Sequence, residues 1–197
     1  MNKFEVMDKL VQYNKGYIKT SDATKKNISR TYFSEYVKER NLIKAAHGIY
    51  MTEDTWQDDI YVTQIRYPQV IFSHETAAYL LELTDREPFK ISLTLKTGES
   101  STRLVKSGLI VYKIKQELYE VGLMLAKSPS GHEIRSYNAE RTVCDIIRSR
   151  SKIEIQEIQT VLKTYLRQKN RNIPKLMRYA KLFSVDSILG QYMEFLL

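Results

Sequence analysis

The sequence predicts an α+β protein, with an N-terminal part of three helices and a β-hairpin and a mixed α/β C-terminal part that ends in several helices. Apolar residues recur at helical spacing near both ends, short apolar runs fill the middle, and turn residues separate these segments. The 197 residues suffice for two small domains, each with its own core. We expect a first domain over residues 1–56, a short linker over residues 57–66 and a second domain over residues 67–197.

The first part begins with a predicted helix over residues 3–14, because its apolar residues return every three or four positions, at Phe4, Met7, Leu10 and Val11. Gly16 is placed to end this helix in a left-handed turn. Residues 17–18 are expected to form a short apolar link to a brief second helix over residues 20–25. Thr20 is the expected cap of this second helix.

The most informative segment is a third predicted helix, which follows a tight turn at residues 26–27. Ser29 is a suitable N-cap, and Ile28 can close over Phe33 as a hydrophobic staple. The apolar residues of this helix, Phe33 among them, fall on one face. The opposite face carries groups of the kind that contact phosphates and base edges, namely Arg30, Thr31, Ser34 and Lys38.

Two short strands are predicted next, over residues 42–46 and 49–51, joined around His47 and Gly48. Three helices followed by a hairpin are the order of a winged helix-turn-helix, in which the third helix reads the major groove of DNA. A merely solvated polar face is the alternative interpretation. We predict that double-stranded DNA is contacted at Lys25, Lys26, Asn27, Ser29, Arg30, Thr31, Ser34, Lys38, Lys44 and His47.

The second part is predicted to contain a small mixed sheet, with strands at residues 70–72, 91–95, 109–114, 121–126 and 134–137. Ser73 is expected to cap a helix over residues 74–83, and Asn138 to cap one over residues 139–148. Further amphipathic helical segments are predicted over residues 153–169, 174–183 and 185–197.

The net charge of +8 is unevenly distributed along the chain. Residues 1–56 hold ten Lys and Arg against seven Asp and Glu, residues 57–137 hold ten against ten, and residues 138–197 hold eleven against six. A basic surface attracts phosphate backbones, although a solubilising surface is an equally good explanation. We expect additional phosphate contacts at Lys163, Arg167, Arg171, Lys175, Arg178 and Lys181.

Composition and cysteine usage limit the other classes of function. The chain has no apolar run of membrane length, and acidic residues stand where a signal peptide needs its apolar region, so we expect a cytoplasmic protein that does not contact a membrane. The single cysteine, Cys144, excludes an internal disulfide and lies on a predicted apolar helix face, which indicates a core position. We expect no cofactor and no metal.

Three segments of the chain resemble the AbiEi family of abortive-infection antitoxins. Residues 67–85, which run Tyr-Pro-Gln-Val-Ile-Phe-Ser-His-Glu-Thr-Ala-Ala-Tyr-Leu-Leu-Glu-Leu-Thr-Asp, look like one family signature, and residues 137–148 are similar to a second block. Gly48-Ile49-Tyr50 matches the end of the family's N-terminal wing. The sequence departs from the family at Asn27, where relatives often carry Gly, and at Glu82, where a small residue is common.

The resemblance implies an antitoxin of a type IV toxin–antitoxin pair, which limits phage spread, and a repressor of its own operon. It implies a winged helix-turn-helix joined to a C-terminal antitoxin domain. The implied functional partner is an AbiEii-type nucleotidyltransferase toxin, countered without a stable complex. Since one winged helix contacts only a few base pairs, we expect a monomer in solution that binds an inverted-repeat operator cooperatively.

A restriction-like or other metal-dependent nuclease with a winged-helix targeting domain is the alternative function. Such a nuclease requires carboxylates that bind Mg²⁺ and a Lys two residues after one of the acidic residues, so that the site can position water. No Asp or Glu of this chain is followed by Lys at that spacing, and the nearest case is Glu133 with Arg135. The histidines, His47, His74 and His132, are far apart in the sequence. We therefore expect no catalytic residues and no enzymatic activity.

Overall fold

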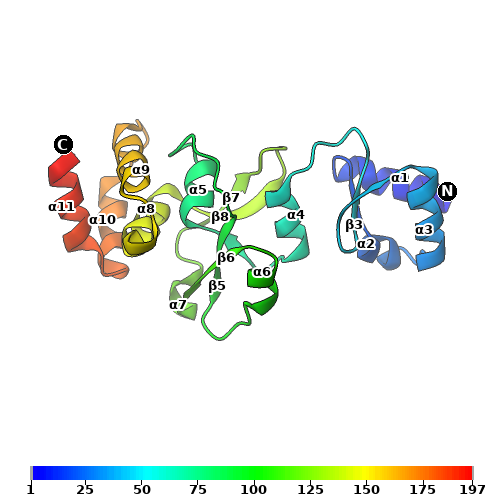
Figure 1. Ribbon diagram of the computed structural model, residues 1–197, viewed down its shortest axis with the longest axis horizontal. Helices are drawn as coiled ribbons and strands as arrows, with labels where there is room; N and C mark the ends of the chain where they lie inside the picture. The colour runs from blue at the N-terminus through cyan, green and yellow to red at the C-terminus, as the bar shows by residue number, and fades with distance from the viewer. Residues whose placement is uncertain (1, 197) are drawn as a thin grey trace. The chain divides into compact units, whose positions relative to one another are not determined.

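The computed structural model describes residues 2–196, and the side chains of residues 2–194. The chain divides into two compact units, Met1–Arg66 and Tyr67–Leu197 (Figure 1). The elements of the first unit are α1 (Lys3–Tyr13), β1 (Tyr17–Lys19), α2 (Thr20–Lys25), α3 (Arg30–Glu39), β2 (Ile43–Ala46), β3 (Ile49–Met51) and α4 (Asp59–Arg66). Three helices followed by a hairpin are thus present in the expected order.

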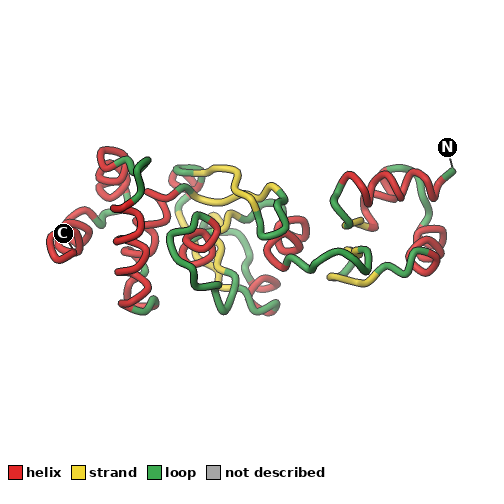
Figure 2. Tube along the Cα trace, turned by 90° about the horizontal axis from the view of Figure 1, so that it is seen from above, coloured by secondary structure: helices red, strands yellow, loops and turns green. Residues whose placement is uncertain are grey.

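The first unit contains a three-stranded antiparallel sheet in the order β1-β3-β2. Its strands are drawn in yellow in Figure 2. Residues 17–18, expected to be a link, belong instead to strand β1, where Ile18 pairs with Tyr50. Both Tyr17 and Ile18 are 1% exposed. A three-residue strand is too short to show alternation, and only its pairing with β3 makes it a strand.

Helices α1, α2 and α3 share a buried cluster with Ile18 of this sheet. Ile28 and Phe33 share one buried cluster with Met7 and Tyr36, as the predicted staple requires. Thr20 is the first residue of α2 and does not cap it, because α2 follows β1 directly and the N-cap position falls on Lys19. The backbone N–H of Thr20 donates to the carbonyl of Gly48 at 2.9 Å, which ties α2 to the hairpin.

Residues 57–66 were expected to be a linker, but residues 59–66 form helix α4 of the first unit. The Asp58 side chain accepts a hydrogen bond from the backbone N–H of Tyr61 at 2.9 Å and so begins the helix. Val62 packs into a buried cluster with Tyr17 and Met51 of the sheet. The apolar face of α4 therefore belongs to the core of the first unit, and residues 59–66 are not a linker.

The second unit is built around a five-stranded mixed sheet in the order β6-β5-β4-β8-β7, in which β4–β8 and β5–β6 are parallel pairs. Its elements are β4 (Ile71–Phe72), α5 (His74–Leu80), β5 (Ser92–Lys96), α6 (Thr102–Lys106), β6 (Ile110–Ile114), α7 (Gln116–Tyr119), β7 (Leu123–Lys127), β8 (Glu133–Tyr137), α8 (Ala139–Arg148), the 3₁₀ turn η1 (Arg150–Lys152), α9 (Ile155–Arg167), α10 (Ile173–Leu182) and α11 (Asp186–Leu196). The predicted small mixed sheet and helical C-terminal end are confirmed. The short helices α6 and α7 were not predicted.

Helix α8 is the centre of the second core, because it contacts α5, α9, α10 and α11 (Figure 1). Residues 140–147 are all buried, and Asn138 caps the helix by accepting from the backbone N–H of Arg141 at 3.0 Å, as predicted. Cys144 is completely buried, which confirms its core position, and burial raises the pKa of its thiol to about 12.

Two non-glycine residues, one in the first unit and one in the second, have an unusual backbone conformation. Asn27 and Glu82 both have positive φ, of 57° and 55°. Glycine adopts this conformation without strain, and Asn tolerates it better than Glu. At Glu82 this conformation follows the early end of α5, which stops at Leu80 rather than at residue 83.

Among the described residues, no helix is long and apolar enough to cross a membrane.

Candidate nucleic-acid interface and buried polar cluster

Helix α3 presents a polar, solvent-exposed face. The Ser29 hydroxyl accepts a hydrogen bond from the backbone N–H of Tyr32 at 3.3 Å and caps the helix as predicted. Phe33 and Tyr36 are buried on the inner face. The four side chains predicted to face DNA are all exposed, namely Arg30, Thr31, Ser34 and Lys38. This surface offers a guanidinium, two hydroxyls and an ammonium to a ligand.

The turn before α3 adds two lysines to this end of the unit. Lys25 and Lys26 are exposed, and Asn27 has the left-handed backbone conformation that lets the chain turn into α3. The Lys25 ammonium lies 3.7 Å from the carboxylate of Asp22, so part of its charge is neutralised within α2.

The hairpin holds the remaining predicted contacts of the first unit. Lys44 is exposed on β2, and His47 is exposed in the turn. Gly48 has φ of 71°, the conformation that the predicted hairpin turn needs. The hydrogen bond from Thr20 to the Gly48 carbonyl anchors the turn beside the start of α2.

Three further charged residues of α3 and its C-cap are exposed but were not among the predicted site residues: Glu35, Glu39 and Arg40. Arg40 donates two hydrogen bonds to the Asp8 carboxylate, from Nε at 3.1 Å and from Nη2 at 2.8 Å. The Arg40 guanidinium holds the pKa of Asp8 below its usual value. The helical spacing of Thr31 and Glu35 could have placed Glu35 on the polar face from the sequence alone.

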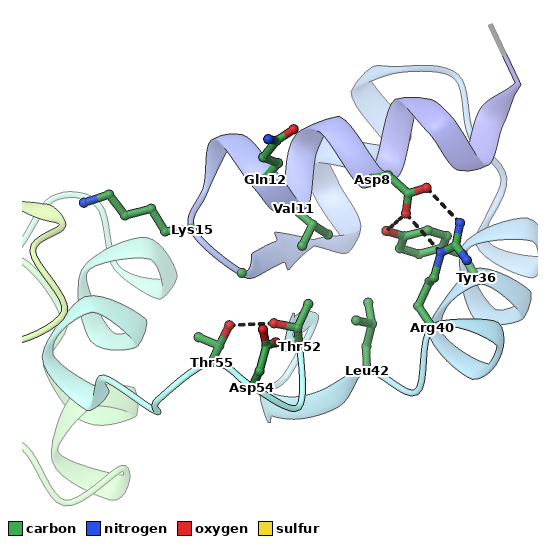
Figure 3. A pocket seen from close by; sticks show the side chains of 11 residues that line it. Asp8, Val11, Gln12, Lys15, Tyr36, Arg40, Leu42, Thr52, Asp54 and Thr55 are labelled. Carbon is green, nitrogen blue, oxygen red and sulfur yellow. Dashed lines mark hydrogen bonds and ion pairs between the residues drawn. The ribbon is translucent and has the colours of Figure 1, made fainter.

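An open pocket of about 550 Å³ lies between α1 and the segment after β3 (Figure 3). The Asp8–Arg40 pair stands at one end of it, where the Tyr36 hydroxyl also donates to Asp8 at 2.8 Å. Across the pocket from α1, the hydroxyls of Thr52 and Thr55 are hydrogen-bonded at 2.6 Å. The charged groups at its rim are of both signs, so the pocket has no net preference for an anion.

The six basic residues predicted to contact phosphate in the second unit differ in their surroundings. Five are exposed, on α9, in the following turn and on α10, namely Lys163, Arg167, Arg171, Arg178 and Lys181. Lys175 is only partly exposed, and its ammonium lies 3.0 Å from the carboxylate of Glu140. Lys175 therefore stabilises the packing of α10 on α8, and its charge is largely neutralised within the protein.

A buried polar cluster surrounds His74 at the carboxyl end of β4. His74 is 3% exposed, and its ring stacks on that of Tyr112 with centroids 3.4 Å apart. Nδ1 lies 2.9 Å from the Ser73 hydroxyl, and Nε2 lies 3.0 Å from the Ser149 hydroxyl. Burial, reinforced by nearby arginines and Lys152, holds the pKa of His74 well below its ordinary value.

Ser73 does not cap α5 by its side chain, contrary to the prediction. The Ser73 hydroxyl accepts a hydrogen bond from Thr94 Oγ1 at 2.8 Å and is also hydrogen-bonded to Nδ1 of His74. Ser73 therefore belongs to the buried cluster. His74 itself has φ of 53°, a strained conformation for a non-glycine residue. The packing and hydrogen bonds around the imidazole hold the backbone in this conformation.

Arg141 and Asp145 form a fully buried ion pair, with Nε 2.9 Å from Oδ2 and side chains 1% and 3% exposed. Nη1 of Arg141 also donates to the carbonyls of Leu118 and Val121, both at 2.9 Å. The guanidinium lies between the rings of Tyr137 and Phe183, 4.1 Å and 3.9 Å from their centroids. A spacing of four residues on a helix suits such a pair, but nothing in the sequence indicates its burial.

Glu133 and Arg135, the nearest approach to a nuclease motif, lie on β8 and bind other groups. Glu133 forms an ion pair with Lys127 at 3.3 Å, and Arg135 donates to the carbonyl of Gln69 at 3.1 Å. Within residues 2–196, no group of three or more His, Cys, Asp and Glu side chains is arranged to hold a metal ion.

Comparison with known proteins identifies a similar fold. No family model and no curated protein matches the chain. The solved structure described as the crystal structure of RV2827C protein from Mycobacterium tuberculosis has 13% sequence identity and a TM-score of 0.52. The similarity covers 97% of this chain and 79% of that chain. At this identity the match concerns the fold alone.

Proposed function

We propose that the first unit is a winged helix-turn-helix that binds double-stranded DNA, with α3 in the major groove and the β2–β3 hairpin against the backbone. The single observation that carries this proposal is the exposed polar face of α3, which combines Arg30, Thr31, Ser34 and Lys38 opposite a buried apolar face. The lysines of the preceding turn and Lys44 of the hairpin supply positive charge for the phosphates on either side.

The proposed role of the whole chain is that of an AbiEi-type antitoxin and repressor of its own operon. This part rests on the resemblance of residues 67–85 and 137–148 to that family. Under this proposal the chain counters a nucleotidyltransferase toxin without a stable complex and represses transcription from an inverted-repeat operator. The protein is a monomer in solution, and its copies bind the operator cooperatively.

Replacing Arg30 and Ser34 together by Ala tests the DNA-binding proposal. Both side chains are exposed, so the fold is retained, while each lost base contact costs roughly 1–3 kcal/mol of binding free energy. In gel-shift titrations with the DNA upstream of the gene, the double variant should lose specific binding. Unchanged affinity with a normal melting curve would refute the role of α3. Ser21, an exposed serine on α2 outside the proposed interface, provides the control variant Ser21→Ala.

Co-expression tests the antitoxin proposal. If the neighbouring gene encodes a nucleotidyltransferase that arrests growth, this chain supplied from an unrelated promoter should restore growth. The Arg30→Ala variant should restore growth equally well, since DNA binding and antitoxicity are proposed to reside in different units. Growth arrest that persists at normal protein levels would exclude the antitoxin role and leave a DNA-binding regulator.

A further inference from the structure

The exposed face of α3 carries an acidic side chain among the groups proposed to face DNA. Successive residues of an α-helix are about 100° apart, so Glu35 lies one turn after Thr31 and beside it on the surface. Glu35 is exposed, as are Thr31 and Lys38. A carboxylate at this position is unexpected on a surface that faces a polyanion, because phosphate repels it.

The structure does not neutralise this carboxylate internally. Asp8 and Asp22, two other acidic residues of the first unit, are paired with Arg40 and with Lys19 and Lys25. Among the described side chains, no ion pair joins Glu35 to a lysine or an arginine. Arg40, the arginine at the end of the same helix, donates to Asp8 instead. Glu35 therefore presents acceptor oxygens that no internal ion pair occupies to whatever α3 contacts.

The major groove offers one kind of group that such a carboxylate can bind. Base edges present two amino donors there, N4 of cytosine and N6 of adenine. Adenine also presents its N7 acceptor beside N6, whereas cytosine presents only the N4 donor, so a glutamate carboxylate accepts best from cytosine. Because a recognition helix contacts bases with its N-terminal turns, Glu35 in the second turn of α3 is within the contacting region. Glu39 lies one turn later, in the last turn of the helix.

We propose that Glu35 is a specificity-determining residue, which selects a cytosine in each half-site and disfavours binding to unrelated DNA. This inference rests on the proposed function of α3. The carboxylate repels phosphates and thymine or guanine acceptors, so it weakens non-specific association. It accepts a hydrogen bond from a cytosine amino group at that position, and this bond increases the binding affinity only for the selected sequence.

Selection of binding sites from a random duplex library, with wild-type protein and the variants Glu35→Gln and Glu39→Gln, tests this inference. Wild-type protein should enrich a motif with one strongly preferred cytosine. Glu35→Gln should reduce that preference roughly ten-fold, or shift it to adenine, and leave the other positions of the motif unchanged. Glu39→Gln should retain the complete motif and bind all sequences slightly more tightly, because it removes only a repulsive charge.

The outcomes separate the two proposals. If wild-type protein enriches a motif and Glu35→Gln enriches the same motif with the same cytosine preference, the role of Glu35 is overturned while DNA binding by α3 stands. If wild-type protein enriches no sequence, the proposed function fails, and the inference fails with it. Melting curves of the two variants should match that of the wild type, since both carboxylates are exposed.

Discussion

Replacing Arg141 with Met should destabilise the second unit by about 3–5 kcal/mol at neutral pH. The substitution retains most of the apolar volume between the rings of Tyr137 and Phe183 but leaves the buried Asp145 carboxylate without its cation. Removing one partner of a buried ion pair costs several kcal/mol, because an uncompensated charge remains in a medium of low dielectric constant. The carbonyls of Leu118 and Val121 also lose a donor.

The loss of stability in Arg141→Met should depend on pH, and the direction of this dependence follows from the protonation of Asp145. Burial already raises the pKa of this carboxyl above 3.8, and the Arg141 guanidinium opposes that shift. Without Arg141 the folded protein binds a proton more tightly than the unfolded chain does. The stability deficit of Arg141→Met should therefore shrink as the pH falls from neutrality toward 4. In the double variant Arg141→Met with Asp145→Asn, this pH dependence should disappear, and part of the lost stability should return.

Urea unfolding followed by hydrogen exchange of peptides from α8 is the appropriate assay, because it measures the second unit separately from the first. Arg86→Ala is the matched control, since Arg86 forms a similar ion pair with Glu154 at 2.6 Å but both side chains are more than half exposed. That control should change stability little. A loss below about 1 kcal/mol in Arg141→Met, or a double variant no more stable than the single one, would refute the reasoning.

Two further predictions concern the basic helices and His74. Replacing Lys163, Arg178 and Lys181 by Gln should weaken binding to all DNA sequences about equally, without altering the preferred sequence. The slope of log affinity against log salt concentration should decrease in magnitude by up to about 3, since up to three phosphate contacts are lost. An unchanged slope would show that these exposed residues are only a solvated surface. Lys175 is left intact in that variant because its ion pair with Glu140 stabilises the fold. The pKa of His74 in the folded protein lies below the ordinary value of 6.5. The neutral imidazole therefore contributes its full stabilisation above pH 6.5. This stabilisation is lost as the pH falls from 6.5 toward the pKa of the folded state, because the unfolded chain then binds the proton more tightly. Unfolding free energies of wild type and His74→Asn, measured between pH 5 and 8, should converge below about pH 6.5, and parallel curves would contradict this assignment.

The sequence by itself determined the elements whose signals are local. The cap at Ser29, the apolar face of α3 and the turn at Gly48 are properties of a few adjacent residues, and the structure has all three. The same holds for α8, where Asn138 and the following apolar residues define the start and the buried face. Caps and periodicity act within one or two helical turns, and that is why they can be recognised without knowledge of distant contacts.

The tertiary structure alone decided the features that depend on distant partners. Strand β1 exists because Ile18 pairs with Tyr50, and α4 is part of the first unit because Val62 reaches the core of the sheet. Ser73, a plausible cap in the sequence, becomes a member of the buried cluster because Thr94 donates to it from the neighbouring strand. Whether a polar side chain is solvated or buried depends on which segments pack around it, and segments far apart in the chain carry no local signal of their pairing.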